Sequence, residues 1–391
     1  MKTIVLAILK RPINYFADNG VRSRHSVQAL VIAVVMFSYA SIGCTGVGQP
    51  EGWSAAVVDD GKAYIGTMDG DFRAIDLETG ATIWKYDLPG DDNKRAVYGS
   101  PALYSGALFF GGYDGVLYAI NQNGESLWDR EVGDASPIVG GTIVDQGRVL
   151  VGSSDGGLYS FDADNGSLEW SFFTEGRIWS TPTVADGVVY FGSLDHKLYA
   201  LSVEDGEELW SFQTNGAVTA KPLVVDGKVY IGSFSSIFYA VDAKTGIEDW
   251  RFEGAGNWFW GGAISANGNV FAPSLDGNIY ALRGQSGDLL WSLSTGGPVI
   301  GSPGIVSDRL VSASTDGRVR LVDLADGTDV RSCDIGSRIR SSITVHDEVI
   351  LVSATDHSIR ALAATASGAD EKWAHFSNRE SPVATGEEKA C

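Results

Sequence analysis

The chain has 391 residues, and its 49 Asp and Glu against 29 Lys and Arg give a formal net charge of −20. This balance excludes DNA and RNA as expected partners, because phosphate backbones are bound by basic surfaces. The 44% of hydrophobic residues can fill a large core, while 49 Gly beside 11 Pro indicate many tight turns rather than a collagen-like or disordered chain.

We expect residues 1–25 to form a leader, and the apolar segment that follows, residues 26–47, carries no charged side chain. This segment is long enough to cross a bilayer, and Arg22 and Arg24 before it predict that the rest of the chain lies on the extracytoplasmic side of the cell membrane. The sequence Ser41-Ile-Gly-Cys44 resembles a lipobox, although Ser41 stands where Leu is usual, so Cys44 is a candidate for lipidation. Three alternatives stay open: a lipoprotein, an uncleaved membrane anchor and a cleaved signal peptide.

Eight copies of one turn follow, at spacings of 45, 41, 40, 40, 41, 40 and 40 residues. The turns are Asp69-Gly70, Asp114-Gly115, Asp155-Gly156, Asp195-His196, Ser235-Ser236, Asp276-Gly277, Asp316-Gly317 and Asp356-His357. A repeat of about 40 residues is typical of propellers and solenoids.

Each copy contains four runs of β-branched and aromatic residues separated by Gly and Asp, which predict short strands joined by hairpin turns. In the fourth copy these runs are strand A at 179–185, strand B at 188–193, strand C at 197–201 and strand D at 208–212. We therefore predict an all-β protein, an eight-bladed β-propeller of four-stranded antiparallel blades over residues 52–376, with every blade built from contiguous sequence. Residues 377–391 are polar, and we expect them to form a disordered tail.

A tryptophan column marks the end of most repeats. A Gly after strand C is followed by a Trp in strand D, and we predict that these Trp side chains dock structurally between neighbouring blades. The predicted docking residues are Trp84, Trp128, Trp170, Trp210, Trp250, Trp291 and Trp373. The seventh repeat has Arg331 at this position.

The two clearest copies of this motif are Ala74-Ile-Asp-Leu-Glu-Thr-Gly-Ala-Thr-Ile-Trp84 and Ala240-Val-Asp-Ala-Lys-Thr-Gly-Ile-Glu-Asp-Trp250. The pattern resembles the tryptophan-docking repeat of the pyrroloquinoline-quinone (PQQ) propeller family. The resemblance implies the eight-bladed fold, and it points to the non-catalytic, BamB-like branch of lipoproteins. Enzymes of this family are similar in carrying adjacent cysteines, a calcium site of Glu, Asn and Asp, and an Asp base, and this chain has no adjacent cysteines.

No catalytic, cofactor-binding or metal-binding residue is predicted. The three cysteines, Cys44, Cys333 and Cys391, are far apart and odd in number, so we expect no disulfide framework and a buried Cys333. The five histidines lack metal-ligand spacing, and most carboxylates lie in Asp-Gly turns, where Asp bonds its own backbone. The lysine-poor, acidic composition favours a halophilic acidic surface, and an ordinary acidic secreted protein is the alternative.

A candidate interaction surface comes from two columns at the start of the A strands, which in a propeller line the central channel. Positions i and i+2 share a strand face, so we expect these side chains to gather at one channel mouth. The surface consists of Trp53, Tyr98, Arg177, Trp179, Trp258, Trp260, Arg338 and Arg340. Trp, Tyr and Arg are favoured at binding hot spots, and the alternative is that these side chains simply fill a wide channel.

These features favour a non-catalytic extracytoplasmic scaffold at the cell envelope, held at the membrane by its N-terminal segment, with an envelope or secreted protein as partner. A PQQ-dependent oxidoreductase and a propeller that binds a sugar or another small ligand are the alternatives. Three repeats also carry Arg73, Arg320 and Arg360 in place of the strand C Tyr of the others. Either this sector docks another segment or a partner, or the terminal repeats have degenerated.

Overall fold

The structure is a computed structural model that describes residues 54–90, 95–365 and 368–378. The predicted leader, the apolar segment at 26–47 with its possible lipidation site Cys44, and Trp53 lie outside these ranges. So does the tail from residue 379 onward. Predictions that concern these parts of the chain therefore stay predictions.

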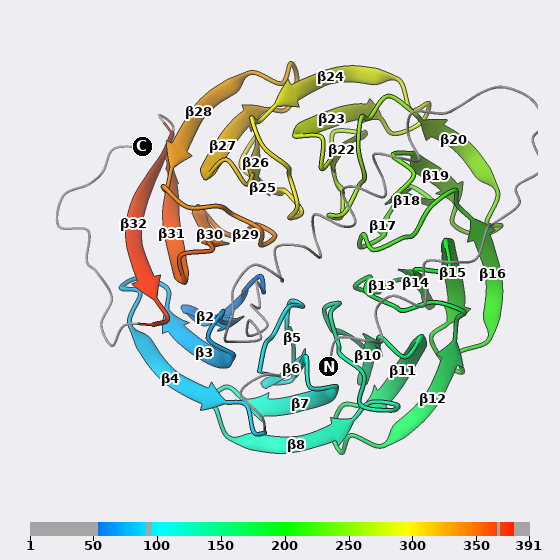
Figure 1. Cartoon of the computed structure of the whole chain (residues 1–391), viewed down its shortest axis with the longest axis vertical. Helices are drawn as coiled ribbons and strands as arrows, with labels where there is room; N and C mark the ends of the chain where they lie inside the picture. The colour runs from blue at the N-terminus through cyan, green and yellow to red at the C-terminus, as the bar shows by residue number, and fades with distance from the viewer. Residues whose placement is uncertain (1–53, 91–94, 366–367, 379–391) are drawn as a thin grey trace, which may run out of the picture. The chain divides into compact units, whose positions relative to one another are not determined.

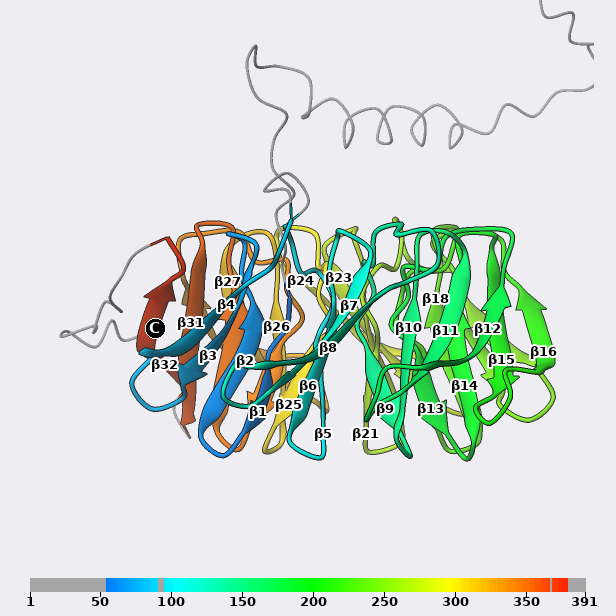
Figure 2. The ribbon, with the colours of Figure 1, turned by 90° about the horizontal axis from the view of Figure 1, so that it is seen from below.

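The eight-bladed propeller is confirmed. Eight four-stranded antiparallel sheets follow one another in chain order, and each is formed by consecutive strands, as predicted. Figure 1 shows them arranged in a ring, with the last sheet beside the first, and Figure 2 shows the strands of each blade running between the two faces of the ring. No blade is completed by a strand from a distant part of the described chain.

The strands of each blade are called A to D from the channel outward. Blade one contains β1 Val57–Asp59, β2 Lys62–Gly66, β3 Asp71–Asp76 and β4 Thr82–Asp87; blade two contains β5 Ala102–Tyr104, β6 Ala107–Gly111, β7 Val116–Asn121 and β8 Ser126–Glu131. Blade three contains β9 Ile143–Asp145, β10 Arg148–Gly152, β11 Gly157–Asp162 and β12 Leu168–Phe173; blade four contains β13 Thr183–Ala185, β14 Val188–Gly192, β15 Lys197–Ser202 and β16 Glu208–Gln213.

Blade five contains β17 Leu223–Val225, β18 Lys228–Gly232, β19 Phe238–Asp242 and β20 Glu248–Phe252; blade six contains β21 Ile264–Ala266, β22 Asn269–Pro273, β23 Asn278–Arg283 and β24 Leu289–Ser294. Blade seven contains β25 Gly304–Val306, β26 Arg309–Ala313, β27 Arg318–Asp323 and β28 Asp329–Asp334; blade eight contains β29 Thr344–His346, β30 Val349–Ser353, β31 Ser358–Thr365 and β32 Gly368–Phe376.

The A strands are shorter than predicted. In blade four the strand begins at Thr183, whereas the sequence predicted a start at 179. Residues 179–182 belong to the crossover that arrives from the preceding blade. Crossovers of neighbouring blades approach each other closely. A Cβ added at Gly140 would lie 2.7 Å from the carbonyl oxygen of Ser180, and one added at Gly261 would lie 2.6 Å from that of Ile300. The crossovers thus converge too closely on the axis to pair as regular ladder strands.

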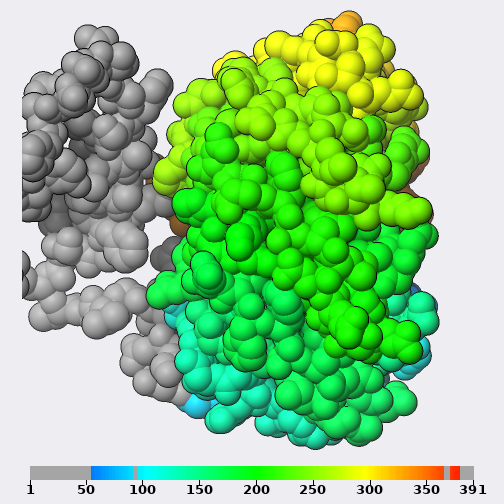
Figure 3. All heavy atoms as spheres, turned by 90° about the vertical axis from the view of Figure 1, so that its right-hand side faces the viewer, coloured from blue at the N-terminus to red at the C-terminus, as the bar shows by residue number. Residues whose placement is uncertain are grey.

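The core is divided among the joints between blades. Each of eight buried hydrophobic clusters among the described residues combines side chains of two neighbouring blades. The cluster that closes the ring packs Ile65 and Ile75 of blade one against Leu351 and Trp373 of blade eight. Burial of apolar surface therefore holds the blades face to face. Figure 3 shows the outer wall that results, seen over the blades of the middle of the chain.

The predicted tryptophan docking has a common geometry. Trp170 of blade three donates its indole N–H to the carbonyl oxygen of Val203 in blade four at 3.0 Å. Its ring lies against Gly206, where an added Cβ would lie 2.6 Å from a ring atom and the backbone has a φ of +73°. Glycine is required there for both reasons. We call this contact, repeated by the seven docking Trp residues, the docking seam.

The seam closes the ring but is interrupted once. Trp373 of β32 is 2% exposed and donates to the carbonyl oxygen of Leu77 in blade one at 2.9 Å. His375 lies beside it, with Nδ1 3.0 Å from the carbonyl oxygen of Gly80 and Nε2 3.2 Å from Arg73 Nη1. Blade seven instead directs Arg331 toward Asp370 of blade eight, at 3.9 Å.

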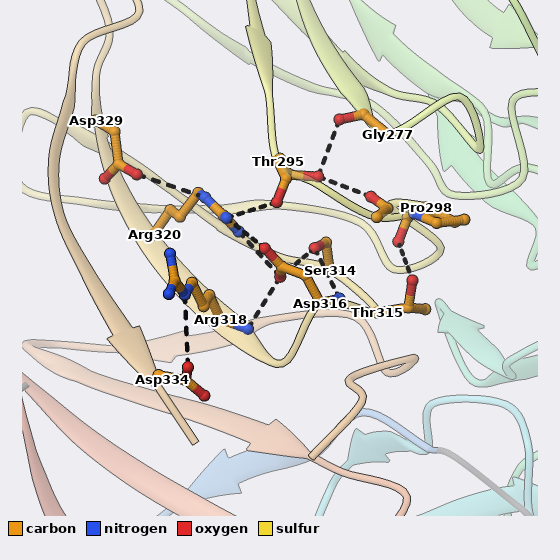
Figure 4. A network of polar contacts seen from close by, with 11 residues as sticks. Gly277, Thr295, Pro298, Ser314, Thr315, Asp316, Arg318, Arg320, Asp329 and Asp334 are labelled. Atoms are coloured by element: carbon orange, nitrogen blue, oxygen red, sulfur yellow. Dashed lines mark hydrogen bonds and ion pairs between the residues drawn. The ribbon is translucent and has the colours of Figure 1, made fainter. Parts of the chain in front are cut away.

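The unusual arginines of blades seven, eight and one are part of the fold. In blade four, the Tyr199 hydroxyl donates to Asp195 of the B–C turn at 2.7 Å. In blade seven, Arg320 takes the place of this Tyr, forms an ion pair with Asp316 and donates to the carbonyl oxygen of Thr295 at 2.6 Å, as Figure 4 shows. Two of these arginines make contacts within the chain and are buried, since the exposed fraction is 5% for Arg320 and 7% for Arg73. Docking of a partner by this sector stays a prediction.

Cys333 on β28 is buried as expected, but it is disulfide-bonded, which three distant cysteines did not lead us to expect. The other two cysteines, Cys44 and Cys391, lie outside the described residues. Within the described ranges, no helix is long and apolar enough to cross a membrane.

Candidate functional site

The channel wall is built by the crossovers that lead into the A strands. Each crossover alternates, because its middle residue is buried between two blades and its neighbours on either side face the other way. The buried residues are Val97, Ile138, Ile178, Val218, Phe259, Val299 and Ile339, all at 1% exposure or less. This alternation brings the two predicted columns onto one face of each crossover.

The first column surrounds the axis. Its seven described members, Tyr98, Val139, Trp179, Thr219, Trp260, Ile300 and Arg340, all line one axial cavity of about 110 Å³. The structure therefore gathers Tyr98, Trp179, Trp260 and Arg340 at the channel. Their role in binding stays a prediction.

The second column lies at the rim instead. Arg177, Trp258 and Arg338 do not line the axial cavity. Their backbone carbonyl oxygens accept hydrogen bonds from the B–C turns of their own blades, at 2.9, 2.8 and 2.9 Å. The side chains of Arg177 and Arg338 are exposed, and Trp258 is half-buried. This column therefore marks where the crossovers meet the B–C turns on one face of the ring.

Three of the predicted residues meet in an aromatic cluster that spans blades four to six. Phe234 stacks on Trp258 with ring centroids 4.5 Å apart, and on Trp260 at 5.4 Å. Trp260 in turn lies 6.4 Å from Trp179. All four side chains are half-buried, so their rings keep a face or an edge in contact with solvent. We call Trp179, Phe234, Trp258 and Trp260 the aromatic cluster.

Sequence reasoning missed Phe234, although a signal was present. Blade five is the one in which Ser235-Ser236 replaces the acidic B–C turn, and Phe234 directly precedes this turn. In blade four the corresponding turn carries Asp195, which accepts the hydrogen bond of Tyr199. The loss of the Asp and the gain of an aromatic side chain occur together at the channel mouth.

A second ring of side chains lies two residues further along each crossover. It consists of Ala55, Ser100, Gly141, Thr181, Lys221, Gly262, Ser302 and Ser342. Hydroxyl groups join neighbouring blades here, since Gly141 N–H donates to Thr181 Oγ1 at 2.7 Å and Gly262 N–H donates to Ser302 Oγ at 2.9 Å. We call this set the small-residue ring, and Lys221 is its one large member. The sequence analysis did not single out Lys221.

The electrostatics of the cavity oppose those of the chain. The charged residues among its described lining are Lys221 and Arg340, and no carboxylate lines it, whereas the chain carries a net charge of −20. Lys221 is reached by water inside the channel, yet the surrounding walls desolvate its ammonium group and lower its pKa. The axial cavity is thus a small cationic and aromatic space.

The carboxylates of the B–C turns are engaged within their own blades. Tyr118, Tyr159 and Tyr280 donate to the turn Asp of their blade at 2.5, 2.6 and 2.7 Å. Burial and this hydrogen bond raise the pKa of Tyr280 to about 12. Among the described residues, no group of three or more His, Cys, Asp or Glu side chains is placed to hold a metal ion. The geometry is suited to binding through aromatic and cationic groups.

Comparison with known proteins places the chain among related propellers. A family model described as "Beta-alanine-activating enzyme, beta-propeller" matches residues 133–386, and one described as "Outer membrane protein assembly factor BamB" matches residues 41–141. A quinone-dependent alcohol dehydrogenase subunit from Gluconacetobacter polyoxogenes is 29% identical over 140 residues, which cover 30% of this chain and 19% of that protein. BamB from Nitrosomonas eutropha is 28% identical over 116 residues, which cover 30% of this chain and 27% of that protein.

The matched region therefore spans about a fifth to a quarter of the length of these two relatives. The crystal structure of BamB from Moraxella catarrhalis superposes with a TM-score of 0.67 at 18% identity, covering 77% of this chain and 93% of that one. At this identity the likeness shows the fold alone. The first of these family models matches more than half of the 391 residues of the chain, and the repeat, the fold and the match to the BamB model agree with it. The chain therefore belongs to the PQQ-like β-propeller family represented by the propeller of the beta-alanine-activating enzyme.

Proposed function

We propose that this propeller is a non-catalytic scaffold of the cell envelope that binds a protein partner at the channel mouth. The observation that carries the proposal is the aromatic cluster, in which four half-buried rings from three blades meet on one face. Large aromatic side chains that are packed on one side and open on the other are typical anchors of protein interfaces.

Exposed arginines on the same face indicate the chemistry of the partner. Arg177 precedes Trp179 by two residues, and Arg338 occupies the equivalent position in blade eight. On a chain with a net charge of −20, such cations favour a partner segment that combines an apolar side chain with acidic groups. An envelope or secreted protein fits this description.

The extracytoplasmic location rests on the N-terminal segment and on the relatives. Residues 26–47 are uncharged and follow Arg22 and Arg24, an arrangement that favours export and anchoring, through Cys44 or through the segment itself. One relative is named an outer membrane protein assembly factor, which supports an envelope location for this chain too. We also propose that the acidic surface is an adaptation to high salt.

Site-directed photo-crosslinking tests the scaffold role. A benzophenone amino acid at Arg177 or Arg338 is expected to capture a defined envelope protein in cells, which mass spectrometry of the adduct identifies. The same probe at Asp226, in the A–B turn of blade five at the opposite end of the strands, is the matched control. Adducts of equal yield and identity at all three positions would contradict docking at the channel mouth.

A quinone-dependent oxidoreductase is the second candidate, because several relatives are quinone-dependent alcohol dehydrogenases. The residues present do not fit a cofactor site of this kind. The axial cavity of about 110 Å³ is smaller than the roughly 300–1,000 Å³ usual for ligand pockets, and the chain has no adjacent cysteines. Incubation of the protein with PQQ and calcium, followed by gel filtration and absorption spectroscopy, is expected to leave no quinone bound. Stoichiometric retention of quinone with alcohol-dependent dye reduction would favour the enzyme instead.

A further inference from the structure

Lys221 departs from the pattern of the ring in which it lies. The other members of the small-residue ring are Ala, Gly, Ser or Thr, and an added Cβ at the neighbouring Gly262 would lie 3.1 Å from Lys221 Cβ. Within the described part of the chain, the Lys221 ammonium group has no hydrogen bond and no ion pair with a carboxylate. A long cationic side chain thus lies in a ring of small residues on the channel wall.

A second polar group beside Lys221 also lacks a partner. Thr219 precedes Lys221 by two residues, so the two side chains share one face of the crossover. Thr219 lines the same cavity, is 6% exposed, and its hydroxyl group is buried with no hydrogen-bond partner. A buried hydroxyl without a partner costs free energy, because buried polar groups are normally paired with protein groups or ordered water.

We infer that Lys221 and Thr219 form a binding site for a carboxylate group inside the axial channel. The ammonium group supplies a positive charge and three hydrogen-bond donors, and the Thr219 hydroxyl supplies a further donor. Arg340 lines the same cavity and adds to its positive potential. An ionised carboxylate accepts hydrogen bonds only, so it matches these donors.

The size and the walls of the cavity narrow the ligand further. A volume of about 110 Å³ is well below the roughly 300–1,000 Å³ of ordinary ligand pockets, which suits acetate or succinate rather than a larger cofactor. The rings of Trp179 and Trp260 and the side chains of Val139 and Ile300 add apolar surface to a lining that is otherwise largely polar. This apolar surface can contact the carbon skeleton of a small organic acid, which an inorganic anion lacks.

Two kinds of molecule carry a carboxylate group that this site would bind. It comes either from a free small organic acid or from a Glu or Asp side chain that a protein inserts into the channel. The inference does not depend on the proposed docking at the aromatic cluster, because both residues line the channel, where Lys221 is open to a free ligand and a rotation about χ1 of Thr219 would bring its buried hydroxyl group to it. Loss of one site therefore leaves the other testable.

Titration of the intact chain with sodium acetate, disodium succinate and the peptide acetyl-Gly-Glu-Gly-amide tests the inference at constant ionic strength. Tryptophan fluorescence reports on Trp179 and Trp260, and NMR of dimethylated lysines reports the pKa of Lys221. We expect saturable binding and a rise of the Lys221 pKa, because a nearby anion favours the ammonium form. Lys221→Met is expected to weaken binding at least tenfold, and Thr219→Val about threefold.

Lys244→Met is the matched control, since it removes an exposed cation outside the channel, and it should leave binding unchanged. Binding of acetate or succinate that depends on Lys221 assigns a free acid. Binding of the peptide alone, with the same dependence, assigns an inserted acidic side chain. The inference is overturned if none of the probes binds, if Lys221→Met binds them as the unaltered chain does, or if sodium chloride competes equally at equal concentration.

Discussion

The docking seam, at the outer D strands, and the channel wall, at the crossovers into the A strands, differ in how closely they follow the repeat. At the seam, six of the first seven joints repeat one contact between a Trp and a Gly of the next blade, and Trp373 repeats it across the ring closure. At the channel, equivalent positions hold Tyr98, Val139, Trp179 and Arg340, with little in common. The repeat thus keeps the side chains that join blades and varies those that surround the axis.

The contact between the B–C turn and strand C within a blade also takes two forms. Blades two, three, four and six join the B–C turn to strand C by a Tyr–Asp hydrogen bond. Blades seven and eight use Arg–Asp ion pairs in the same place, and blade one pairs Arg73 with Asp71. Variation in a repeat therefore does not by itself mark a binding site, and the structural partners of each variant residue must be known first.

The largest expected effect separates a seam tryptophan from a cluster tryptophan. Trp373→Ala should lower the free energy of unfolding by about 3–5 kcal/mol, because it leaves a cavity where the ring closes and removes the hydrogen bond to Leu77. Trp258→Ala should cost about 1 kcal/mol or less, since its half-buried ring lies at the rim. Urea denaturation of the two variants provides the comparison. Equal losses would mean that the aromatic cluster is part of the core.

A smaller effect should distinguish the two kinds of turn contact. Arg320→Met leaves Asp316 without its buried ion pair and should destabilise by about 3 kcal/mol. Tyr199→Phe removes one hydrogen bond and should cost about 1 kcal/mol. Arg320→Tyr restores the pattern of blade four, and it should recover most of the loss measured for Arg320→Met. No recovery would show that the arginine sector has a role beyond holding its turn.

Ring closure should respond to acid through His375. Burial and the charge of Arg73 lower its pKa, although the hydrogen bond to Gly80 acts in the opposite direction. Nδ1 must donate to the Gly80 carbonyl oxygen, so Nε2 accepts from Arg73 and the folded state holds the neutral ring. Stability is therefore full above the unfolded-state pKa of about 6.5, and it falls as the pH drops below that value toward the folded-state pKa. Thermal unfolding from pH 7.5 to 5 should show this fall, and His375→Gln should reduce its slope; an unchanged slope would argue against this role.

The smallest effect on stability should accompany the clearest loss of binding. Arg177→Ala with Arg338→Ala removes two exposed side chains, so unfolding should change by no more than about 0.5 kcal/mol. Recovery of the crosslinked partner, with the probe placed in Trp258, should nevertheless drop several-fold. Arg283→Ala, an exposed arginine on β23 away from the channel, is the matched control. A loss of the same size in the control would indicate a general effect of charge.

The repeats made the fold predictable, whereas the channel was predictable only in part. Eight copies of the same turn and seven docking Trp residues specify the blades redundantly, and a pattern written many times survives local exceptions. The crossovers were mistaken for the first residues of the A strands, because buried and channel-facing residues alternate there as in a strand. Lys221 and Phe234 each depart from the repeat at a single position, and the sequence alone does not show where such a side chain points. The contact of Arg73 with His375, which are 302 residues apart, needs the closed ring.

Hydrogen–deuterium exchange of the intact chain, with and without the partner identified by crosslinking, tests the location of the binding surface most directly. The account predicts protection in the crossovers around residues 177–180 and 256–261 and in the B–C turn at 233–236, with the outer strands unchanged. Protection confined to the outer D strands or to the A–B turns would contradict it, and would place the function of the propeller away from its channel.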